Sequence, residues 1–454
     1  MTKTLENNLT EGNVLKQLIK FAIPLLIANI LQSLYSTVDM IIVGNFADSA
    51  GLSAVSIGAQ IMMLVTNAGA GLTMGGQIII AQYTGARDRE GQLRTIGTTV
   101  SFVALLSVVV TVLGLILYRP ILTLMNTPAE SLAQARQYLF VSITGVIFIM
   151  GYNAVCCILR ALGDSKRPMV FVGIATVVNI IGDLVFVAGF KLGALGAALA
   201  TVGAQAVSFV CATIYLYKHR DIFVFDFKKD SFRIMKDKLK MILKIGIPFA
   251  VQFSIISLSV MFIVSMINSH GVAASAAYGV GGKIDNFAMM PYFAIESAAS
   301  TMVGQCIGAG RKDRVQKVVR FTMLVNMTMA IVEFAIIQLF PEFFIMIFNQ
   351  DPAVIEYGVL YLRIVTFSYF AFASMTAYNS IVMGVGNSTL SLIGSILDGV
   401  VLRLSLSCLF VYVFDWGMTG ILLATMLSPF GVTLVSGIYY HTGMWKKKEI
   451  IHGG

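Results

Sequence analysis

Charged residues are scarce in this sequence. They account for 12% of its 454 residues, while hydrophobic residues account for 57% and the mean hydropathy is +0.83. A soluble domain typically carries about 25% charged residues. The composition therefore excludes an ordinary soluble domain and predicts a polytopic membrane protein.

Residues that usually mark metal or enzyme chemistry are also few. The five cysteines are an odd number without metal-ligand spacing, and we interpret them as small core residues. The four histidines lie at segment ends, which argues against a histidine proton relay within the membrane. There is no phosphate-binding glycine loop, HExxH motif, zinc cysteine cluster or nucleophile elbow. We therefore expect no metal, no cofactor, no use of ATP and no enzymatic activity, which leaves an ion gradient as the energy source.

What the sequence does contain is a series of twelve hydrophobic segments. Nearly all of them are long enough to cross a bilayer as helices, and segments this long and continuously apolar exclude a β-barrel. The predicted fold class is an all-α integral membrane protein with twelve transmembrane helices. The segments span residues 15–43, 53–83, 95–118, 136–159, 169–190, 195–217, 241–268, 273–306, 319–340, 357–383, 389–413 and 418–440.

Lysine and arginine are unevenly distributed between the loops. If the N-terminus is cytoplasmic, 26 of the 32 lysine and arginine residues fall on the cytoplasmic side, as the positive-inside rule requires. The even number of segments then places the C-terminus on the same side. This distribution accounts for the net charge of +9 without a nucleic-acid partner.

The chain repeats itself at an offset of 224 residues. Leu15–Pro24 reads LKQLIKFAIP and Leu239–Pro248 reads LKMILKIGIP, so five of ten positions are identical. Because six segments are an even number, both halves have the same orientation, as in transporters built from parallel repeats. We predict two six-helix bundles related by a pseudo-two-fold axis along the membrane normal. The predicted divisions are an N-lobe (1–217), a basic cytoplasmic linker (218–240) and a C-lobe with a short tail (241–454).

The first segment carries polar residues that lipid anchoring alone does not explain. Pro24 removes a backbone donor and allows the helix to bend. Asp39 is a carboxylate within an apolar segment, which is costly in hydrocarbon. Tyr35 lies one turn before it on the same face, and Gln32 continues that polar stripe. The alternative is that Asp39 is only a helix-end residue near the headgroups.

A second acid occurs in the fifth segment. Asn179 and Asp183 lie one turn apart on one helical face, and their counterparts in the second half are not acidic. Asp183 lies about 22 Å along its helix from the cytoplasmic edge and Asp39 about 28 Å along its own, so both are expected in the outer half of the membrane. Two carboxyl groups that meet in a cavity of low dielectric constant titrate as a pair, and they attract organic cations. The alternative is two unrelated acids at the outer interface.

The second half has intramembrane charges of its own. Glu296 follows Pro291 in the eighth segment and is a functional candidate. Asp398 and Arg403 lie five residues apart in the eleventh segment, a spacing that is imperfect for an α-helical pair, and we interpret Arg403 as half of a structural ion pair. Met289 and Tyr292 are candidates for the lining of an adaptable apolar pocket, although ordinary core packing is the alternative.

These features resemble the multidrug and toxic compound extrusion (MATE) family, in its DinF-like bacterial branch. The resemblance covers almost the whole chain: twelve helices in two lobes, Pro24 with Val38–Asp39 and Val43–Gly44, the LRALGD loop at 159–164, and the N-x-x-x-D pattern that ends at Asp183. It implies that carboxylates of the first and fifth helices take up protons and that the first helix bends at its proline to expel the drug. The residues that match this network are Pro24, Gln32, Tyr35, Asp39, Asn153, Asn179, Asp183 and Thr201.

The resemblance implies a secondary active antiporter of the bacterial cytoplasmic membrane that exports amphipathic organic cations in exchange for protons. Sodium coupling is an alternative, but residues 248–267 lack the acid that the seventh helix carries in the sodium-coupled branch. A lipid-linked saccharide flippase of the same superfamily is another, although it would need a cationic cavity. An integral membrane enzyme is a third, without a catalytic cluster to support it. We expect small-molecule cations and membrane lipids as partners and a monomeric protein.

Overall fold

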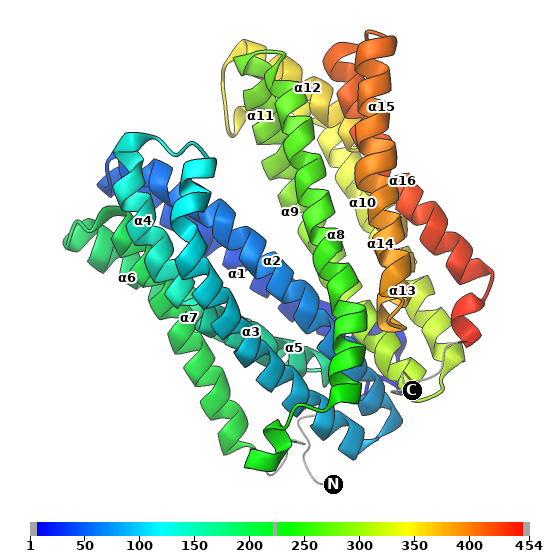
Figure 1. The fold of residues 1–454 in the computed structure, drawn as a ribbon. Coiled ribbons are helices and arrows are strands. Elements are labelled where there is room, and N and C mark those ends of the chain that lie inside the picture. The colour runs from blue at the N-terminus through cyan, green and yellow to red at the C-terminus, as the bar shows by residue number, and fades with distance from the viewer. Residues whose placement is uncertain (1–6, 221–224, 448–454) are drawn as a thin grey trace. The chain divides into compact units, whose positions relative to one another are not determined.

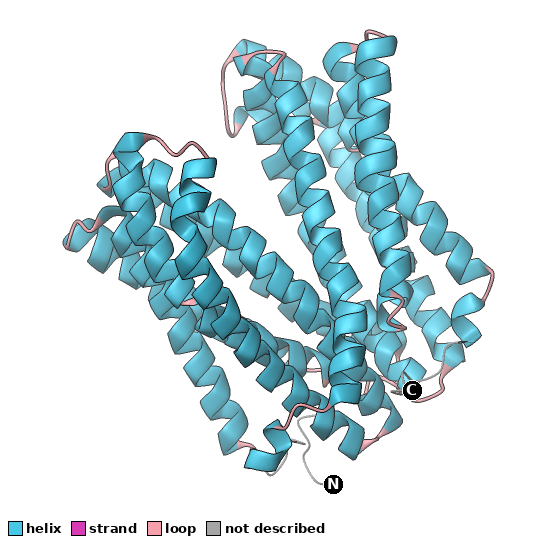
Figure 2. Cartoon of the chain, in the orientation of Figure 1, coloured by secondary structure: helices cyan, strands magenta, loops and turns pink. Residues whose placement is uncertain are grey.

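The computed structural model describes residues 7–220 and 225–447. Within these ranges all regular structure is helical and no strand is found (Figure 2). Each of the twelve predicted segments corresponds to one long helix or to consecutive helical pieces (Figure 1). The α-helices are α1 (Val14–Phe46), α2 (Ser49–Ala86), α3 (Arg89–Leu124), α4 (Ala129–Thr144), α5 (Val146–Ala161), α6 (Lys166–Asp183), α7 (Gly193–Lys218), α8 (Lys236–Asn268), α9 (Val272–Gly308), α10 (Lys312–Leu339), α11 (Pro341–Met346), α12 (Pro352–Val365), α13 (Ser368–Gly384), α14 (Ser388–Ile396), α15 (Ser405–Cys408) and α16 (Gly417–His441).

Three stretches close π-helical turns instead of α-helical ones. They are η1 (Leu184–Gly189), η3 (Leu397–Leu404) and η4 (Leu409–Val413). The first begins directly after Asp183, and the second contains both Asp398 and Arg403. Short 3₁₀ turns, η2 (Lys229–Phe232) and η5 (Met444–Lys447), lie outside the long helices.

Among the described residues, nine helices are long and apolar enough to cross a membrane, and eleven spans result if two bent pairs each count as one. The bent pairs are α4 with α5 (44°) and α12 with α13 (43°). They occupy corresponding places in the two halves of the chain, so the bend repeats with the sequence. The remaining long helix is α9, which has 37 residues and carries Lys283, Asp285 and Glu296.

The chain forms two compact units. Unit 1 contains Asn7, Asn8 and Ile23–Ala250, and unit 2 contains Leu9–Ala22 and the described residues from Val251 onward. Both divisions fall inside a long helix, within three residues of Pro24 in α1 and of Pro248 in α8. Unit 1 therefore includes the first turns of α8, and unit 2 includes the first turns of α1.

Unit 1 is held together by close packing of helices with small residues at their contacts. Its buried core includes Ala54, Leu139, Ala197 and Ala198 from α2, α4 and α7. A methyl group placed on Gly182 would lie 2.9 Å from the Cβ of Ala200, so α6 and α7 approach closely. This contact holds Asn179 and Asp183 of α6 beside α7.

The turn between α1 and α2 is fixed by a capping carboxylate. Asp48 accepts from the backbone N–H of Gly51 (2.7 Å) and from the Gln134 side chain on α4 (3.0 Å). The Gln134 amide, with the Gly51 N–H, holds the pKa of the Asp48 carboxyl below its usual range. The contact joins the N-terminal ends of α2 and α4 near the end of α1 that carries Asp39.

The basic linker packs against the helices of unit 1 along part of its length. The Ser101 hydroxyl donates to the Phe232 carbonyl (2.6 Å), and Phe225 is buried. The Lys238 ammonium, in the first turn of α8, donates to the Tyr83 hydroxyl (2.6 Å). The start of α8 is therefore anchored to α2.

In unit 2, α13 packs against α9, α10 and α16. The hydrophobic core of unit 2 includes Tyr292, Tyr361 and Tyr369, whose hydroxyl groups lie among apolar side chains. Acids of α9 and α10 lie beside these hydroxyls, as described below.

The contact between α2 and the start of α8 depends on glycine. A methyl group on Gly75 would lie 2.4 Å from the carbonyl oxygen of Ile242, which is backbone and cannot rotate away. Gly75→Ala should therefore lower the thermal midpoint of the detergent-solubilised protein, with a cost of about 1–3 kcal/mol for overpacking. Gly203→Ala is the matched control, because no atom lies within 4 Å of the added methyl group. Equal midpoints for the two variants would show that this glycine contact does not hold α8 against α2.

Candidate functional site

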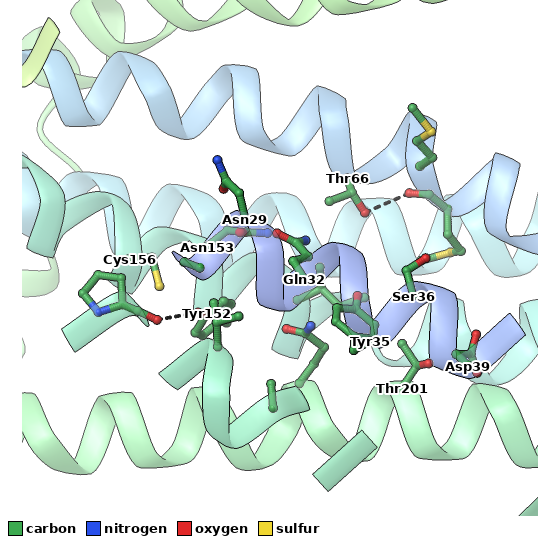
Figure 3. A pocket seen from close by; sticks show the side chains of 18 of the residues that line it. Asn29, Gln32, Tyr35, Ser36, Asp39, Thr66, Tyr152, Asn153, Cys156 and Thr201 are labelled. Atoms are coloured by element: carbon green, nitrogen blue, oxygen red, sulfur yellow. Dashed lines mark hydrogen bonds between the residues drawn. The ribbon is translucent and has the colours of Figure 1, made fainter. Parts of the chain in front are cut away.

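An elongated cavity of about 280 Å³ lies inside unit 1. One wall is a face of α1, whose residues from Leu25 to Asp39 line the cavity at intervals of three and four, as one helical face does. Helices α2, α4, α5, α6 and α7 form the remaining walls. Figure 3 shows Asn29, Gln32, Tyr35, Ser36 and Asp39 following one another along this face of α1.

The structure brings Asp39 and Asp183 together at one end of this cavity. Asp39 lines the wall, and Asp183 is fully buried next to it, close enough for a hydrogen bond between the two side chains when one of them carries a proton. Within residues 7–220 and 225–447, neither acid forms an ion pair with lysine, arginine or histidine. The two acids therefore lie next to each other, as the sequence predicted.

Several buried oxygen atoms around this acid pair have no hydrogen-bond partner among the described residues. No donor of the described chain hydrogen-bonds to Oδ1 of Asp39, to either carboxyl oxygen of Asp183, to Oδ1 of Asn179 or to Oε1 of Gln205. The Asn179 amide donates a long bond to the Thr201 hydroxyl (3.4 Å). Buried acceptors are costly to leave unpaired, so this end of the cavity favours a ligand that brings positive charge or a proton.

The other residues predicted for this network also lie at the cavity. Tyr35, Asn179, Thr201 and Gln205 surround a small pocket of about 10 Å³ beside the acid pair. Gln32 and Asn153 line the middle of the cavity from α1 and α5 (Figure 3). Gln205 was missed from the sequence, although it lies one helical turn after Thr201, a position from which it faces the same space.

Pro24 is buried near the start of the cavity-lining face of α1, one residue before Leu25. The helix continues through it from Val14 to Phe46. The proline thus lies between the part of α1 that belongs to unit 2 and the part that lines the cavity.

The residues predicted for the second half do not form one site. Glu296 accepts from the Asn379 amide (2.7 Å), and Ser391 donates to the Asn379 carbonyl oxygen (3.2 Å). Met289 and Tyr292 are packed in the core of unit 2. The Tyr292 hydroxyl donates to Glu333 (2.6 Å).

Asp398 and Arg403 form the ion pair that the sequence suggested. The guanidinium contacts both carboxylate oxygens at 3.1 Å, and its Nε donates to the Ser428 hydroxyl (3.1 Å). The five-residue spacing, imperfect for an α-helix, fits the π-helical turns of η3, which close at i to i+5. The pairing was predicted from the sequence, but the π-helical conformation of the backbone was not.

Two intramembrane acids were missed. Asp285 accepts from the hydroxyls of Tyr361 and Tyr369 (2.7 Å for the latter), and Glu333 accepts from Tyr292. Their signal in the sequence was their presence within the apolar segments 273–306 and 319–340. Because their partners come from other helices, the sequence could not show what holds them.

Comparison with known proteins gives consistent matches. The MatE family model matches residues 24–185 and again residues 248–409, two ranges with the same offset as the repeat in the sequence. A Bacillus subtilis protein named "Probable multidrug resistance protein YpnP" is 30% identical over 446 residues, covering 97% of this chain and 98% of that protein. "Probable multidrug resistance protein NorM" of Thermotoga maritima is 26% identical over 441 residues, covering 96% and 94%.

The fold is shared with a solved structure of a transporter of the MOP superfamily from Pyrococcus furiosus. That structure matches with a TM-score of 0.91 over 98% of this chain and 99% of its own, at 23% sequence identity. Together with the helices described above, this similarity confirms the predicted fold class.

Proposed function

The chain belongs to the MatE family of transporters, and on this premise we propose that it exports amphipathic organic cations in exchange for protons. The cavity of unit 1 binds the cation, and Asp39 with Asp183 binds the coupling proton. The names of the relatives, multidrug resistance proteins, support drug-like compounds as the substrates. The protein acts as a transporter in the bacterial cytoplasmic membrane, with both termini in the cytoplasm.

The observation that carries this proposal is the carboxyl pair without a basic partner. A buried charge must be compensated or neutralised. At this site a proton does so by bridging the two carboxyl groups, and an organic cation does so by approaching Asp39 from the cavity. Because the two ligands compensate the same charge, each weakens the binding of the other, as exchange requires.

Sodium is the second candidate for the coupling ion. The same carboxylate and amide oxygens are hard ligands of the kind that such cations prefer. The close approach of two carboxyl groups favours the proton, because a pair of this kind holds one proton between its members.

Transport into inverted membrane vesicles tests the proposal. An acidic lumen should drive uptake of a fluorescent organic cation, whereas a sodium gradient of the same size, without a pH difference, should not. Vesicles that carry the Asp39→Asn, Asp183→Asn variant provide the background. Uptake driven by sodium alone would show that sodium is the coupling ion instead of the proton. If neither gradient drives uptake, the proposed function is wrong.

The position of Pro24 predicts a hinge. Its ring removes one backbone hydrogen bond of α1, so straight and bent forms of the helix differ little in energy. Pro24→Ala should leave the protein folded and inserted but slow transport several-fold, because alanine stabilises the straight form. The measurement is the initial uptake rate at equal protein content in the same vesicles. Full activity of the alanine variant would refute the hinge role.

A further inference from the structure

The cavity of unit 1 carries opposite charges at its two ends. Asp39 lies at one end, and Arg160, in the last turn of α5, lines the cavity as well. Figure 3 shows Asp39 and Cys156 at opposite ends, and Arg160 follows Cys156 by one further turn of α5. The stretch of α1 that lines the cavity, from Leu25 to Asp39, is about 21 Å long. The guanidinium is therefore remote from the acid pair.

Arg160 is not neutralised by an acid of the described chain. Its Nε donates to the side-chain oxygen of Gln77 on α2 (3.3 Å), and it is in no ion pair within the ranges that the structure describes. The acid nearest to it in sequence, Asp164, is buried and already occupied by the Arg167 guanidinium and by the backbone N–H groups of Lys166 and Arg167.

An arginine side chain has five N–H donors in a planar arrangement that matches a carboxylate. The Nε of Arg160 is used by Gln77, which leaves the two terminal amino groups for a ligand. The lining also includes the apolar side chains of Met62 and Ile149, beside polar ones such as Gln32 and Asn153. The cavity thus offers an acidic end, a basic end and a lining of mixed polarity between them.

We propose that Arg160 binds a carboxylate of the transported molecule, and that the preferred substrates are zwitterionic amphiphiles rather than simple cations. This inference rests on the proposed export function and narrows its substrate class. The basic group of the substrate lies toward Asp39, its body lies along α1 and α5, and its carboxylate receives two hydrogen bonds from the Arg160 guanidinium. Such charge-assisted hydrogen bonds are about twice as strong as neutral ones.

A matched pair of probes tests this assignment. The first is a cationic rhodamine with an alkyl spacer that ends in a carboxylate, and the second is the methyl ester of the same compound. Fluorescence anisotropy with purified protein in detergent gives the two dissociation constants. We expect the wild type to bind the acid about tenfold more tightly than the ester, the equivalent of one charge-assisted hydrogen bond.

Three variants separate the role of Arg160 from a general effect of charge. Arg160→Gln should reduce the ratio of the two dissociation constants to about one, and Arg160→Lys should give an intermediate ratio, because an ammonium group keeps the charge but not the planar fork. Lys166→Gln removes the same charge from an exposed side chain six residues later and should keep the wild-type ratio. A wild-type ratio near one, or an unchanged ratio in Arg160→Gln, would overturn the proposal.

Uptake of both probes into vesicles distinguishes this inference from the proposed function. If the ester is exported in exchange for protons but the ratio does not depend on Arg160, the carboxylate site is wrong and the export function stands. If neither probe is transported while the binding ratio depends on Arg160, the site stands and the export function fails.

Discussion

Replacing Asp39 and Asp183 together by asparagine should abolish proton release when substrate is added to the solubilised protein. In the wild type, an organic cation that approaches Asp39 competes with the proton that the two carboxyl groups share. The proton is then released to the medium. Asparagine keeps the shape of each side chain, with an amide NH2 donor in place of one carboxyl oxygen, but binds no proton in this pH range, so the variant has none to release.

The same variant should lose proton-driven uptake. Coupling between two ligands of one protein typically amounts to about 5- to 150-fold in affinity, and this factor is lost when the shared site is removed. Each single variant should lose most of the coupling as well, because one remaining carboxyl group lacks the second one that holds the proton with it. Binding of weakly charged ligands should survive, since Gln32, Asn153 and the apolar lining remain.

Proton release is measured with a pH indicator in weakly buffered solution at several starting pH values. Asp48→Asn is the matched control, because Asp48 is an exposed acid of the same unit that caps α2 and lies outside the cavity. If the wild type and the double variant release equal numbers of protons, the coupling site lies elsewhere. The acids of unit 2, Glu296, Asp285 and Glu333, would then be the next residues to replace.

The sequence was sufficient for the helices and for the two acids that the structure brings together in unit 1. Long apolar segments specify helices because backbone groups in lipid must pair within the segment. The repeat supplied an internal control: the position 224 residues after Asp39 is Ile263, so the fold itself does not require an acid there. That comparison identified Asp39 and Asp183 as functional candidates before any contact between them was known.

What the sequence could not supply were contacts between helices far apart in the chain. Asp285 receives hydrogen bonds from tyrosines 76 and 84 residues later, and no local pattern marks such a pairing. Arg160 belongs to the LRALGD stretch, which ends a helix, and only the structure shows that it also lines the cavity of unit 1. The observed helices also extend beyond the predicted segments, as α2 (Ser49–Ala86) does beyond 53–83, because a helix does not end where its apolar residues end.

The π-helical turns of η3 are a feature of the backbone that the sequence also did not predict. Five residues separate Asp398 from Arg403, and in an α-helix this spacing rotates the two side chains away from each other. A π-helix accommodates about one more residue per turn and places them together. In the buried interior of unit 2, the Arg403 guanidinium then donates hydrogen bonds to the Asp398 carboxylate and to the Ser428 hydroxyl.

Removing the cation of this pair should therefore destabilise unit 2 strongly. Arg403→Met keeps an unbranched stem but removes the guanidinium, and it leaves the Asp398 carboxylate buried without a charge partner. Breaking a buried pair in this way costs about 3–5 kcal/mol. We expect a lower yield of folded protein and a lower thermal midpoint in detergent, measured by loss of the monodisperse species after heating.

The decisive comparison is with the variant that lacks both charges. Asp398→Leu, Arg403→Met should recover most of the lost stability, because apolar groups of similar volume replace a buried ion pair at little cost. A purely structural role also requires that the double variant keep its proton-driven uptake, whereas Asp39→Asn, Asp183→Asn should lose it at equal stability. If Arg403→Met is as stable as the wild type, the pair does not support the fold. If the double variant is stable but inactive, Asp398 and Arg403 take part in transport, and the π-helical turns of η3 hold a functional site.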